Sequence, residues 1–302
     1  MGQSEKRCLG SLCLLLGYTR QGYYQHLRRV EKEGLQSDLL IQEVLRHRKL
    51  QKRLGARKLL FLMEAFMVTA GIAMGRDTFF GLLRGQNLLV RKRRGRKPRT
   101  TFSYSWMSKY PNLAKDFIPT GANQLWVSDI TYIRVGDGFA YLSLITDAYS
   151  RKIVGFYLSR DLSAMGCIEA LKMALANNPE RKDLIHHSDR GLQYHSAHYV
   201  ALLKPSVLIS MTENSDPLEN AIAERVNGIL KDELLEQRFD SYSAAVRAVA
   251  IAISTYNNLR PHSSVDMLMP AIAHTHTGEL KRRWKNYYSI NNQKEVARDG
   301  VR

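Results

Sequence analysis

The chain has 302 residues, of which 44% are hydrophobic and 9% aromatic, a composition typical of a globular protein large enough for two domains. Its formal net charge of +17 is unevenly distributed. Residues 1–120 hold 24 Lys and Arg against 8 Asp and Glu, whereas residues 121–302 hold 21 against 20. The front part therefore has the charge of a protein that binds a polyanion, with nucleic acid as the leading partner. A merely solvated basic surface is the alternative, but it does not explain so sharp a boundary.

Several classes of protein are excluded by what the sequence lacks. The three cysteines (Cys8, Cys13, Cys167) form no CxxC pair, which fits a reducing compartment and argues against a disulfide scaffold. The nine histidines have no Cys/His arrangement with zinc spacing. The apolar run 9–16 is not followed by a signal-peptide cleavage site, and no stretch is long enough to span a membrane. We therefore expect a cytoplasmic protein.

The front part shows helical periodicity in two stretches, about 9–27 and 59–84, and glycines interrupt both. Short helices separated by glycine turns in a basic context favour a helix-turn-helix-like DNA-binding region, here assigned to residues 1–90. A plain helical bundle would show the same pattern.

A basic segment follows, RKRRGRKPR at 91–99. Its charge, glycine and proline predict an extended, solvated chain within a linker over 91–118. A simple tether is one interpretation, but the charge favours phosphate contacts. The predicted DNA-contacting residues here are Arg91, Lys92, Arg93, Arg94, Arg96, Lys97 and Arg99.

The back part changes character from about residue 119. Alternating apolar residues predict three antiparallel strands, and shorter apolar runs alternating with helical patterns predict two more. The expected strands are 124–135, 139–148, 151–159, 184–187 and 207–211, and the expected helices are 163–177, 196–204, 220–235 and 242–257. This order predicts an α/β domain with a mixed five-stranded sheet flanked by helices, over 119–285, and a tail over 286–302.

Three carboxylates stand out by position. Asp129 interrupts the apolar run of the first strand, Asp189 ends the fourth, and Glu224 lies off the apolar stripe of the long helix. Taken alone, each is ordinarily a capping or solvated residue. A buried cluster of carboxylates is costly unless divalent cations neutralise it, and two such ions can clamp the oxygens of a phosphoryl displacement. The three residues are therefore predicted to hold one or two divalent cations, two Mg²⁺ or Mn²⁺ ions in the favoured case, for catalysis on DNA or RNA.

Five motifs occur in order along the chain: WVSDITYI, ITDAYSRKIVGF, HHSDRGLQY, ENAIAERVNGILKDEL and YNNLRPHSSVDMLMP. Together they resemble the integrase-type DDE transposases of bacterial insertion sequences, specifically the second-frame (OrfB) product of the IS-three group. The resemblance is strong over about 120–275 and looser in front. It implies a ribonuclease-H-like fold and a catalytic triad of Asp129, Asp189 and Glu224.

The same resemblance implies a function and partners. It points to a metal-dependent DNA transposase that cleaves element ends and joins the freed 3′ hydroxyl to another DNA phosphate. Double-stranded DNA would be the substrate, and the enzyme would work as a homo-multimer at the bacterial nucleoid. The upstream-frame protein of the same element is a possible partner. A ribonuclease-H-like nuclease or resolvase that only hydrolyses DNA, or a non-catalytic DNA-binding regulator, is the alternative.

The chain departs from the family pattern in places. Thirty-four residues separate Asp189 from Glu224, where the family usually has thirty-five. Glu219 stands where many relatives have Asp, so it remains a rival third ligand, although Glu224 fits the Asn-Ala-x-x-Glu pattern better. On the same side of the helix as Glu224, Asn220 and Lys231 are predicted DNA contacts.

Other motif residues have structural interpretations at least as good as functional ones. Asp147 is expected to anchor a strand-end turn to Arg151, and Trp126 and Tyr132 are expected in the core. His187 could orient Asp189 or fill its strand. The Arg260-Pro261-His262 stretch could contact DNA or form an ordered loop.

Overall fold

The computed structural model describes residues 2–91, 110–179, 183–204, 206–213 and 220–281. The chain divides into two compact units, one of residues 1–49 and 54–91, the other of 50–53 and 92–302. In the described parts, no helix is both long and apolar enough to cross a membrane. The basic residues 92–99 and the rival ligand Glu219 lie outside the described residues. Their roles, and the domain boundaries expected from the sequence, stay predictions.

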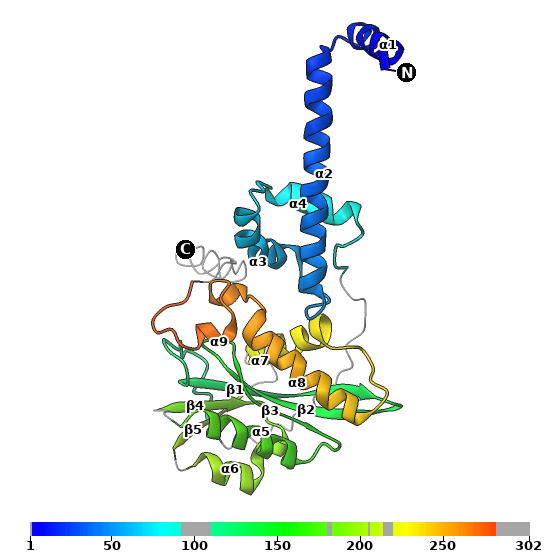
Figure 1. Cartoon of the computed structure of the whole chain (residues 1–302). Coiled ribbons are helices and arrows are strands. Elements are labelled where there is room, and N and C mark those ends of the chain that lie inside the picture. Colours follow the sequence, from blue (N-terminus) through cyan, green and yellow to red (C-terminus); the bar gives the residue numbers. More distant parts are fainter. Residues whose placement is uncertain (1, 92–109, 180–182, 205, 214–219, 282–302) are drawn as a thin grey trace, which may run out of the picture. The chain divides into compact units, whose positions relative to one another are not determined.

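The first unit consists of helices (Figure 1): α1 Gly2–Leu15, α2 Arg20–Arg48, α3 Ala56–Thr69 and α4 Arg76–Gly85. Its core joins the last third of α2 to α3 and α4 through Leu40, Val44, Leu59, Met63, Phe79 and Leu83. The sequence pattern followed α2 only to about residue 27, but the helix continues through the charged stretch to Arg48. Arg, Lys and Glu are good helix formers, so the helix continues through the charged stretch to the apolar face formed by Leu40, Ile41 and Val44.

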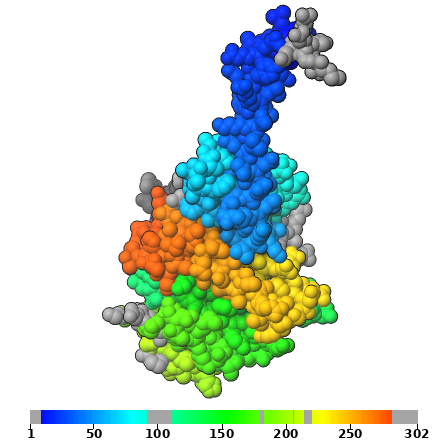
Figure 2. All heavy atoms as spheres, viewed as in Figure 1, coloured from blue at the N-terminus to red at the C-terminus, as the bar shows by residue number. Residues whose placement is uncertain are grey.

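The first half of α2 is exposed on all sides. Thr19 caps its start, with Oγ1 accepting a hydrogen bond from the Gly22 amide at 3.0 Å. Tyr23, Leu27 and Val30 are all exposed. In Figure 2 this blue part of α2 extends beyond α3 and α4 of the same unit.

The second unit is built on one mixed sheet of five strands in the order β3-β2-β1-β4-β5. The strands are β1 Leu125–Val135, β2 Gly138–Asp147, β3 Ile153–Ser159, β4 Leu184–Ser188 and β5 Val207–Met211. The first three form an antiparallel meander, while β4 and β5 run parallel to β1. The predicted mixed sheet and its ribonuclease-H-like arrangement are confirmed, with β1 at the centre.

Helices cover both faces of this sheet. On one face lie α5 Ala164–Asn177 and α6 Ala197–Leu203. On the other lie α7 Ala221–Ile229, the π-helical turn η4 Leu230–Leu234 and α8 Tyr242–Leu259. Short elements complete the unit: η2 Leu192–His195, η5 Ser263–Val265 and α9 Pro270–Ala273. The sheet is therefore the middle layer of a helix–sheet–helix sandwich.

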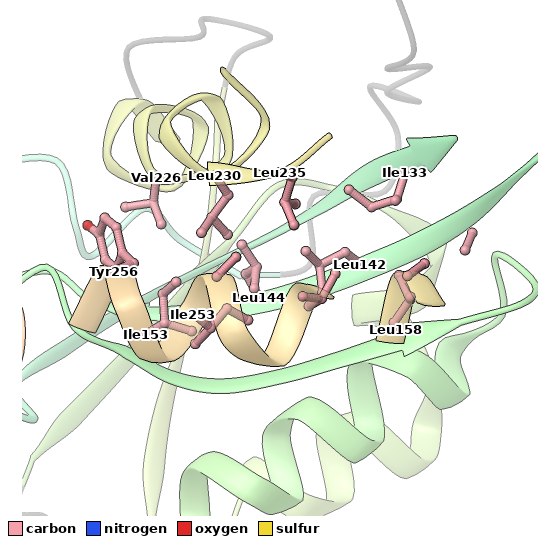
Figure 3. Packing of buried hydrophobic residues seen from close by; sticks show 14 of the residues in the cluster. Ile133, Leu142, Leu144, Ile153, Leu158, Val226, Leu230, Leu235, Ile253 and Tyr256 are labelled. Carbon is pink, nitrogen blue, oxygen red and sulfur yellow. The ribbon is translucent and has the colours of Figure 1, made fainter. Parts of the chain in front are cut away.

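The core on the α7 and α8 face is shown in Figure 3. Ile133 and Leu142 of the sheet meet Val226 and Leu230 of the α7–η4 segment, and Ile253 of α8 packs against the same cluster. The apolar stripe predicted for the long helix is thus its buried face. Side chains of a strand alternate between faces, so Trp126 packs on the opposite side, against α5.

Side chains of α8 cover the free edge of the sheet at β3. The Asn257 amide accepts a hydrogen bond from the Ile153 N–H at 2.9 Å and donates one to the Ile153 carbonyl at 2.9 Å. The Tyr242 hydroxyl donates to the Leu158 carbonyl. An exposed edge strand offers unpaired backbone groups to other chains, and these contacts close part of that edge.

Strand β3 and helix α5 approach each other closely at Gly155. A Cβ atom there would lie 2.2 Å from the Ala170 carbonyl oxygen and 2.8 Å from the Ala174 Cβ. Both neighbours belong to the helix, so a side chain at this position would have to push α5 away from the sheet.

We predict that Gly155→Ala lowers the free energy of unfolding by about 1–3 kcal/mol, because overpacking a tight interface forces backbone shifts. The control is Gly228→Ala in α7, where a new Cβ meets no heavy atom within 4 Å. That change should stabilise the unit by roughly 0.5–1 kcal/mol, because alanine loses less entropy in a helix. Urea unfolding of both variants measures the effects, and equal stability of the two would contradict the predicted close contact.

Candidate active site

Asp129 occupies the centre of the sheet, as the fifth residue of β1. Its neighbours Val127 and Ile133 point to the α7 and α8 face, and the alternation of the strand turns Asp129 the same way. The Asp129 Oδ1 accepts a hydrogen bond from the Ile130 amide at 2.9 Å, and Oδ2 accepts one from the Asn227 side-chain amide at 2.7 Å. A strand carboxylate is thereby held by a residue of α7.

Asp189 follows the last residue of β4. The parallel register pairs Val127 with His187, so two further residues on each strand bring Asp189 beside Asp129. The strand stops there, and the Asp189 Oδ1 accepts a hydrogen bond from the Gly191 amide at 3.0 Å. An Asp that binds the backbone two residues on is typical of a tight turn. The turn thus directs a carboxylate to the end of β4 next to Asp129.

The electrostatics of these residues show that they share one environment. Burial, the neighbouring charge of Asp189 and, to a smaller extent, that of Glu224 raise the pKa of Asp129 to about 7. Burial also raises the pKa of Asp189, although the Gly191 amide and the charges of His195 and Arg190 act in the opposite direction. The charges of Asp189 and Glu224 are therefore both close enough to Asp129 to raise its pKa.

Glu224 lies in the first turn of α7 on an exposed face of the helix. Two hydrogen bonds beside the Asn227 contact tie α7 and η4 along β1. The Asn220 side-chain amide donates to the Ser128 carbonyl at 3.0 Å, and the Lys231 ammonium donates to the Thr131 hydroxyl at 3.3 Å. The helix side that carries Glu224 is thus aligned with the strand that carries Asp129. Asn220 is buried and Lys231 exposed, and the DNA contacts of both stay predictions.

The donor set suits a hard divalent cation. Asp129 and Asp189 present carboxylate oxygens side by side, and oxygen ligands are those that Mg²⁺ prefers. Within the described ranges, no three His, Cys, Asp or Glu side chains converge tightly enough to form a complete metal cluster. The two aspartates therefore fit a cation directly, and Glu224 lies within electrostatic reach of them.

Two features of the site were not assigned a role from the sequence. The first is Asn227, three residues after Glu224 on the same helix side, a spacing that could have suggested a shared target. The second is a buried hydrogen-bonded triangle of Ser128, His186 and Tyr199 on the other side of the sheet. The His186 Nε2 lies 2.7 Å from the Ser128 hydroxyl and 2.8 Å from the Tyr199 hydroxyl.

This triangle joins β1, β4 and α6 next to the two aspartates. Burial lowers the pKa of His186 to about 3, so its imidazole is neutral at physiological pH. A neutral ring can hydrogen-bond to hydroxyl groups without introducing a charge beneath Asp129 and Asp189. The triangle therefore holds the two strands together without altering the charge of the site.

Asp147 is fully buried and anchors the turn after β2. Its Oδ1 accepts hydrogen bonds from the Ser150 amide and hydroxyl, both at 2.7 Å, and its Oδ2 accepts one from the Asn123 amide at 2.8 Å. The Arg151 amide donates to the Asp147 carbonyl at 2.9 Å. Asp147 thus anchors the turn, as the structural interpretation expected. Its carboxylate binds Ser150 and the Asn123 backbone, and Arg151 binds its backbone carbonyl.

The remaining motif residues are structural in the same way. Trp126 is fully buried, as expected, and Tyr132 is half-buried with its ring edge-on to Tyr141. His187 lies with Nδ1 2.8 Å from the Ser210 hydroxyl on β5. Arg260 is buried, which favours the ordered loop over a DNA contact.

Comparisons with known proteins agree with this site. An integrase core domain family matches residues 119–212, and a second integrase core domain family matches residues 206–270. A transposase of insertion sequence element IS629 from Shigella sonnei is 29% identical over 97% of this chain and 97% of its own length. An uncharacterised 31 kDa protein of insertion element IS600 from Shigella sonnei is 31% identical over 86% of this chain and 96% of its own.

A third relative is the transposase InsF of insertion sequence IS3A from Escherichia coli K12, 29% identical over 86% of this chain and 91% of its own. Among solved structures, the HTLV-2 integrase catalytic core domain in complex with magnesium covers 52% of this chain and 99% of its own, with 17% identity and a TM-score of 0.42.

The two integrase core matches together include Asp129, Asp189 and Glu224. This chain aligns with nearly the whole length of each relative, and two of the three are named as transposases of insertion sequences. A nuclease that only hydrolyses DNA and a non-catalytic regulator are not favoured. The chain therefore belongs to the insertion-sequence transposases of the integrase-core (DDE) superfamily, the polynucleotidyl transferases of DNA transposition.

Proposed function

We propose that this protein cleaves a phosphodiester bond at each end of an insertion sequence and joins the freed 3′ hydroxyl to another DNA phosphate. The observation that carries the proposal is the placement of Asp129 beside Asp189, where β4 ends. Helix α7, which carries Glu224, packs on this site, and its Asn227 side chain donates a hydrogen bond to Asp129. The three carboxylates are the proposed catalytic residues and the proposed ligands of Mg²⁺ or Mn²⁺, as two ions.

The residues around the triad prepare it for this role. The Asn227 amide and the Ile130 amide each bind one oxygen of Asp129, which fixes the orientation of the carboxylate and leaves a further lone pair on each oxygen. The Gly191 amide orients Asp189 in the same way. When bound, divalent cations supply nucleophile activation and charge stabilisation for in-line phosphoryl transfer. No covalent protein intermediate is required.

DNA is the proposed substrate and partner. The front 120 residues carry a net charge of +16, and counterion release from phosphate contacts would provide affinity for any duplex. Joining two ends of one element requires that both be held at once, so a homo-multimer on DNA at the nucleoid is proposed. The upstream-frame protein of the element is a further proposed partner.

We predict that Asp129→Asn, Asp189→Asn and Glu224→Gln each reduce end cleavage and strand joining to background, because each removes a metal-ligand charge. Binding to element ends should be largely retained, since the basic front part is untouched. Product sizing on labelled element ends with Mg²⁺ measures cleavage and joining, and a gel shift measures binding.

The rival ligand provides the control for this series. Glu219→Gln should retain joining if Glu224 is the third ligand. Full activity of Glu224→Gln together with loss in Glu219→Gln would exchange the two assignments. Cleavage without any joining in the native protein would favour the hydrolytic alternative.

We further predict that Asp129→Asn raises the melting temperature of the metal-free protein at pH 8. The folded pKa of about 7 exceeds the ordinary value of 3.8, so ionised Asp129 destabilises the fold at all pH values above 7. The cost diminishes from pH 7 to pH 4 and vanishes below, where the carboxyl is neutral in both states. The melting difference between wild type and variant should diminish accordingly.

The control for this experiment is Asp137→Asn, an exposed carboxylate at the tip of the β1–β2 hairpin. It should show no comparable gain at pH 8. Mg²⁺ should raise the melting temperature of the native protein more than that of Asp129→Asn. A variant that melts below the native protein at pH 8 without metal would refute the destabilising role of the charge.

The basic segment 91–99 gives a prediction about salt. If all seven of its basic residues meet a phosphate, they contribute about −6 to the slope of log affinity against log salt. Since seven phosphate contacts are rarely all made at once, replacing all seven residues by Gln should flatten the slope by about 3 to 5. Affinity should fall alike for element ends and random DNA, because phosphate contacts do not read sequence.

The measurement is a binding titration over a salt series, in which the native protein and the seven-Gln variant are each tested on element ends and on random DNA. An unchanged slope would make the segment a tether. Selective loss on element ends would show that the segment reads sequence.

A further inference from the structure

Arg260 directly follows the last residue of α8 and has no role in the proposed chemistry. It is nevertheless a charged residue buried in the interior. Its side chain is 1% exposed although it carries a permanent charge. A charge this deeply buried is costly unless it is paired and hydrogen-bonded. The surroundings of Arg260 therefore indicate what it is for.

The partner of Arg260 is Glu233, and the pair is bidentate. The Arg260 Nε donates to Glu233 Oε2 at 2.9 Å, and Nη2 donates to Oε1 at 2.8 Å. The guanidinium also lies 5.9 Å from the ring centre of Tyr256, and Nη1 is 3.4 Å from the Pro261 carbonyl. Two parallel hydrogen bonds fix the relative orientation of the groups, which a single contact does not.

Glu233 belongs to the same continuous helical segment as Glu224. The π-helical turn η4 begins where α7 ends, and the Leu235 amide closes it on the Leu230 carbonyl at 2.8 Å. Asn227 lies in α7 and Glu233 lies in η4, so the two residues hold this segment at different points along its length. The segment is thus bonded to β1 through Asn227 and to the end of α8 through Arg260.

Stability alone does not explain such a pair. Replacing a buried ion pair by apolar side chains of similar size is often neutral or stabilising, whereas removing one partner is strongly destabilising. The segment is already packed by apolar residues, with Val226 and Leu230 against Ile253 and Tyr256 (Figure 3). Apolar burial is non-directional, so it resists separation of α7 from α8 better than it resists sliding.

We propose that Arg260 is a positioning residue, which through Glu233 sets the rotation and axial position of α7 so that Glu224 meets the cation at Asp129 and Asp189. The inference rests on the proposed function. Glu224 is exposed and has the weakest influence on the pKa of Asp129, so its ability to reach a cation there depends on the position of α7. A displacement of about 1 Å is enough to impair a catalytic arrangement.

The test compares two kinds of change. In Arg260→Gln the Glu233 carboxylate loses the bidentate hydrogen bonds from Arg260, and the melting temperature should fall. In the double variant Arg260→Met, Glu233→Met the pair is replaced by apolar groups, and the melting temperature should stay within a few degrees of the native value. The full-length double variant should nevertheless bind Mn²⁺ about 10-fold more weakly in calorimetry, since indirect supports of metal ligands have effects of that size.

The control is Asn257→Ala, one turn earlier on α8. Asn257 bonds to Ile153 of the edge strand and not to the α7–η4 segment, so its loss should lower the melting temperature while leaving Mn²⁺ affinity unchanged. Native Mn²⁺ affinity in the double Met variant would overturn the proposal. If that variant does not fold, Arg260→Lys decides, because it keeps the charge and loses the bidentate geometry. Several-fold weaker Mn²⁺ binding then supports the proposal, and unchanged binding overturns it.

The same measurements separate this inference from the proposed function. If the native protein binds no Mn²⁺ and joins no DNA, the proposed function fails. If Glu224→Gln binds Mn²⁺ as the native protein does, the assignment of the third ligand fails. The proposed function and the Glu224 assignment can both hold while the Arg260 variants bind Mn²⁺ as the native protein does. In that case only the positioning role is refuted.

Discussion

The repulsion between Asp129 and Asp189 is the constraint on which the rest of this structure depends. Two carboxylates are held side by side where burial and their mutual charge raise the pKa of Asp129 to about 7. Such an arrangement opposes folding, so it has to be imposed by the surrounding structure. The use we propose for it is to bind divalent cations, whose positive charge would offset the repulsion between the carboxylates.

The sheet imposes the arrangement from within. Strand β1 is central, and its parallel partner β4 ends where the two aspartates come level. On the α5 side, the neutral His186 joins the strands through Ser128 and Tyr199. The charged groups thus lie on one side of the sheet, while the side-chain contact between Ser128 and His186 lies on the other.

The helices on one face of the sheet also hold the two aspartates in this arrangement. The α7–η4 segment is bonded to β1 by Asn220, Asn227 and Lys231 and to the end of α8 by the Glu233–Arg260 pair. Motifs that are far apart in sequence therefore meet in one place, and the contact between Asn227 and Asp129 spans 98 positions. The first and fourth motifs carry Asp129 and Glu224, and the last supplies the arginine that holds the helix between them.

The sequence by itself determined the order of strands and helices in the second unit, the apolar stripe of α7, and the candidate carboxylates, because periodicity and strand ends are local properties. It underestimated α2, whose charged stretch continues the helix as far as the buried residues Leu40 and Val44. Only the tertiary structure decided that Asn227 binds Asp129 across 98 positions, that Asp147 uses Ser150 and Asn123, and that Arg260 is buried against Glu233. The physical reason is that hydrogen bonds and ion pairs between distant residues depend on how the elements pack, and no local pattern in the chain specifies that packing.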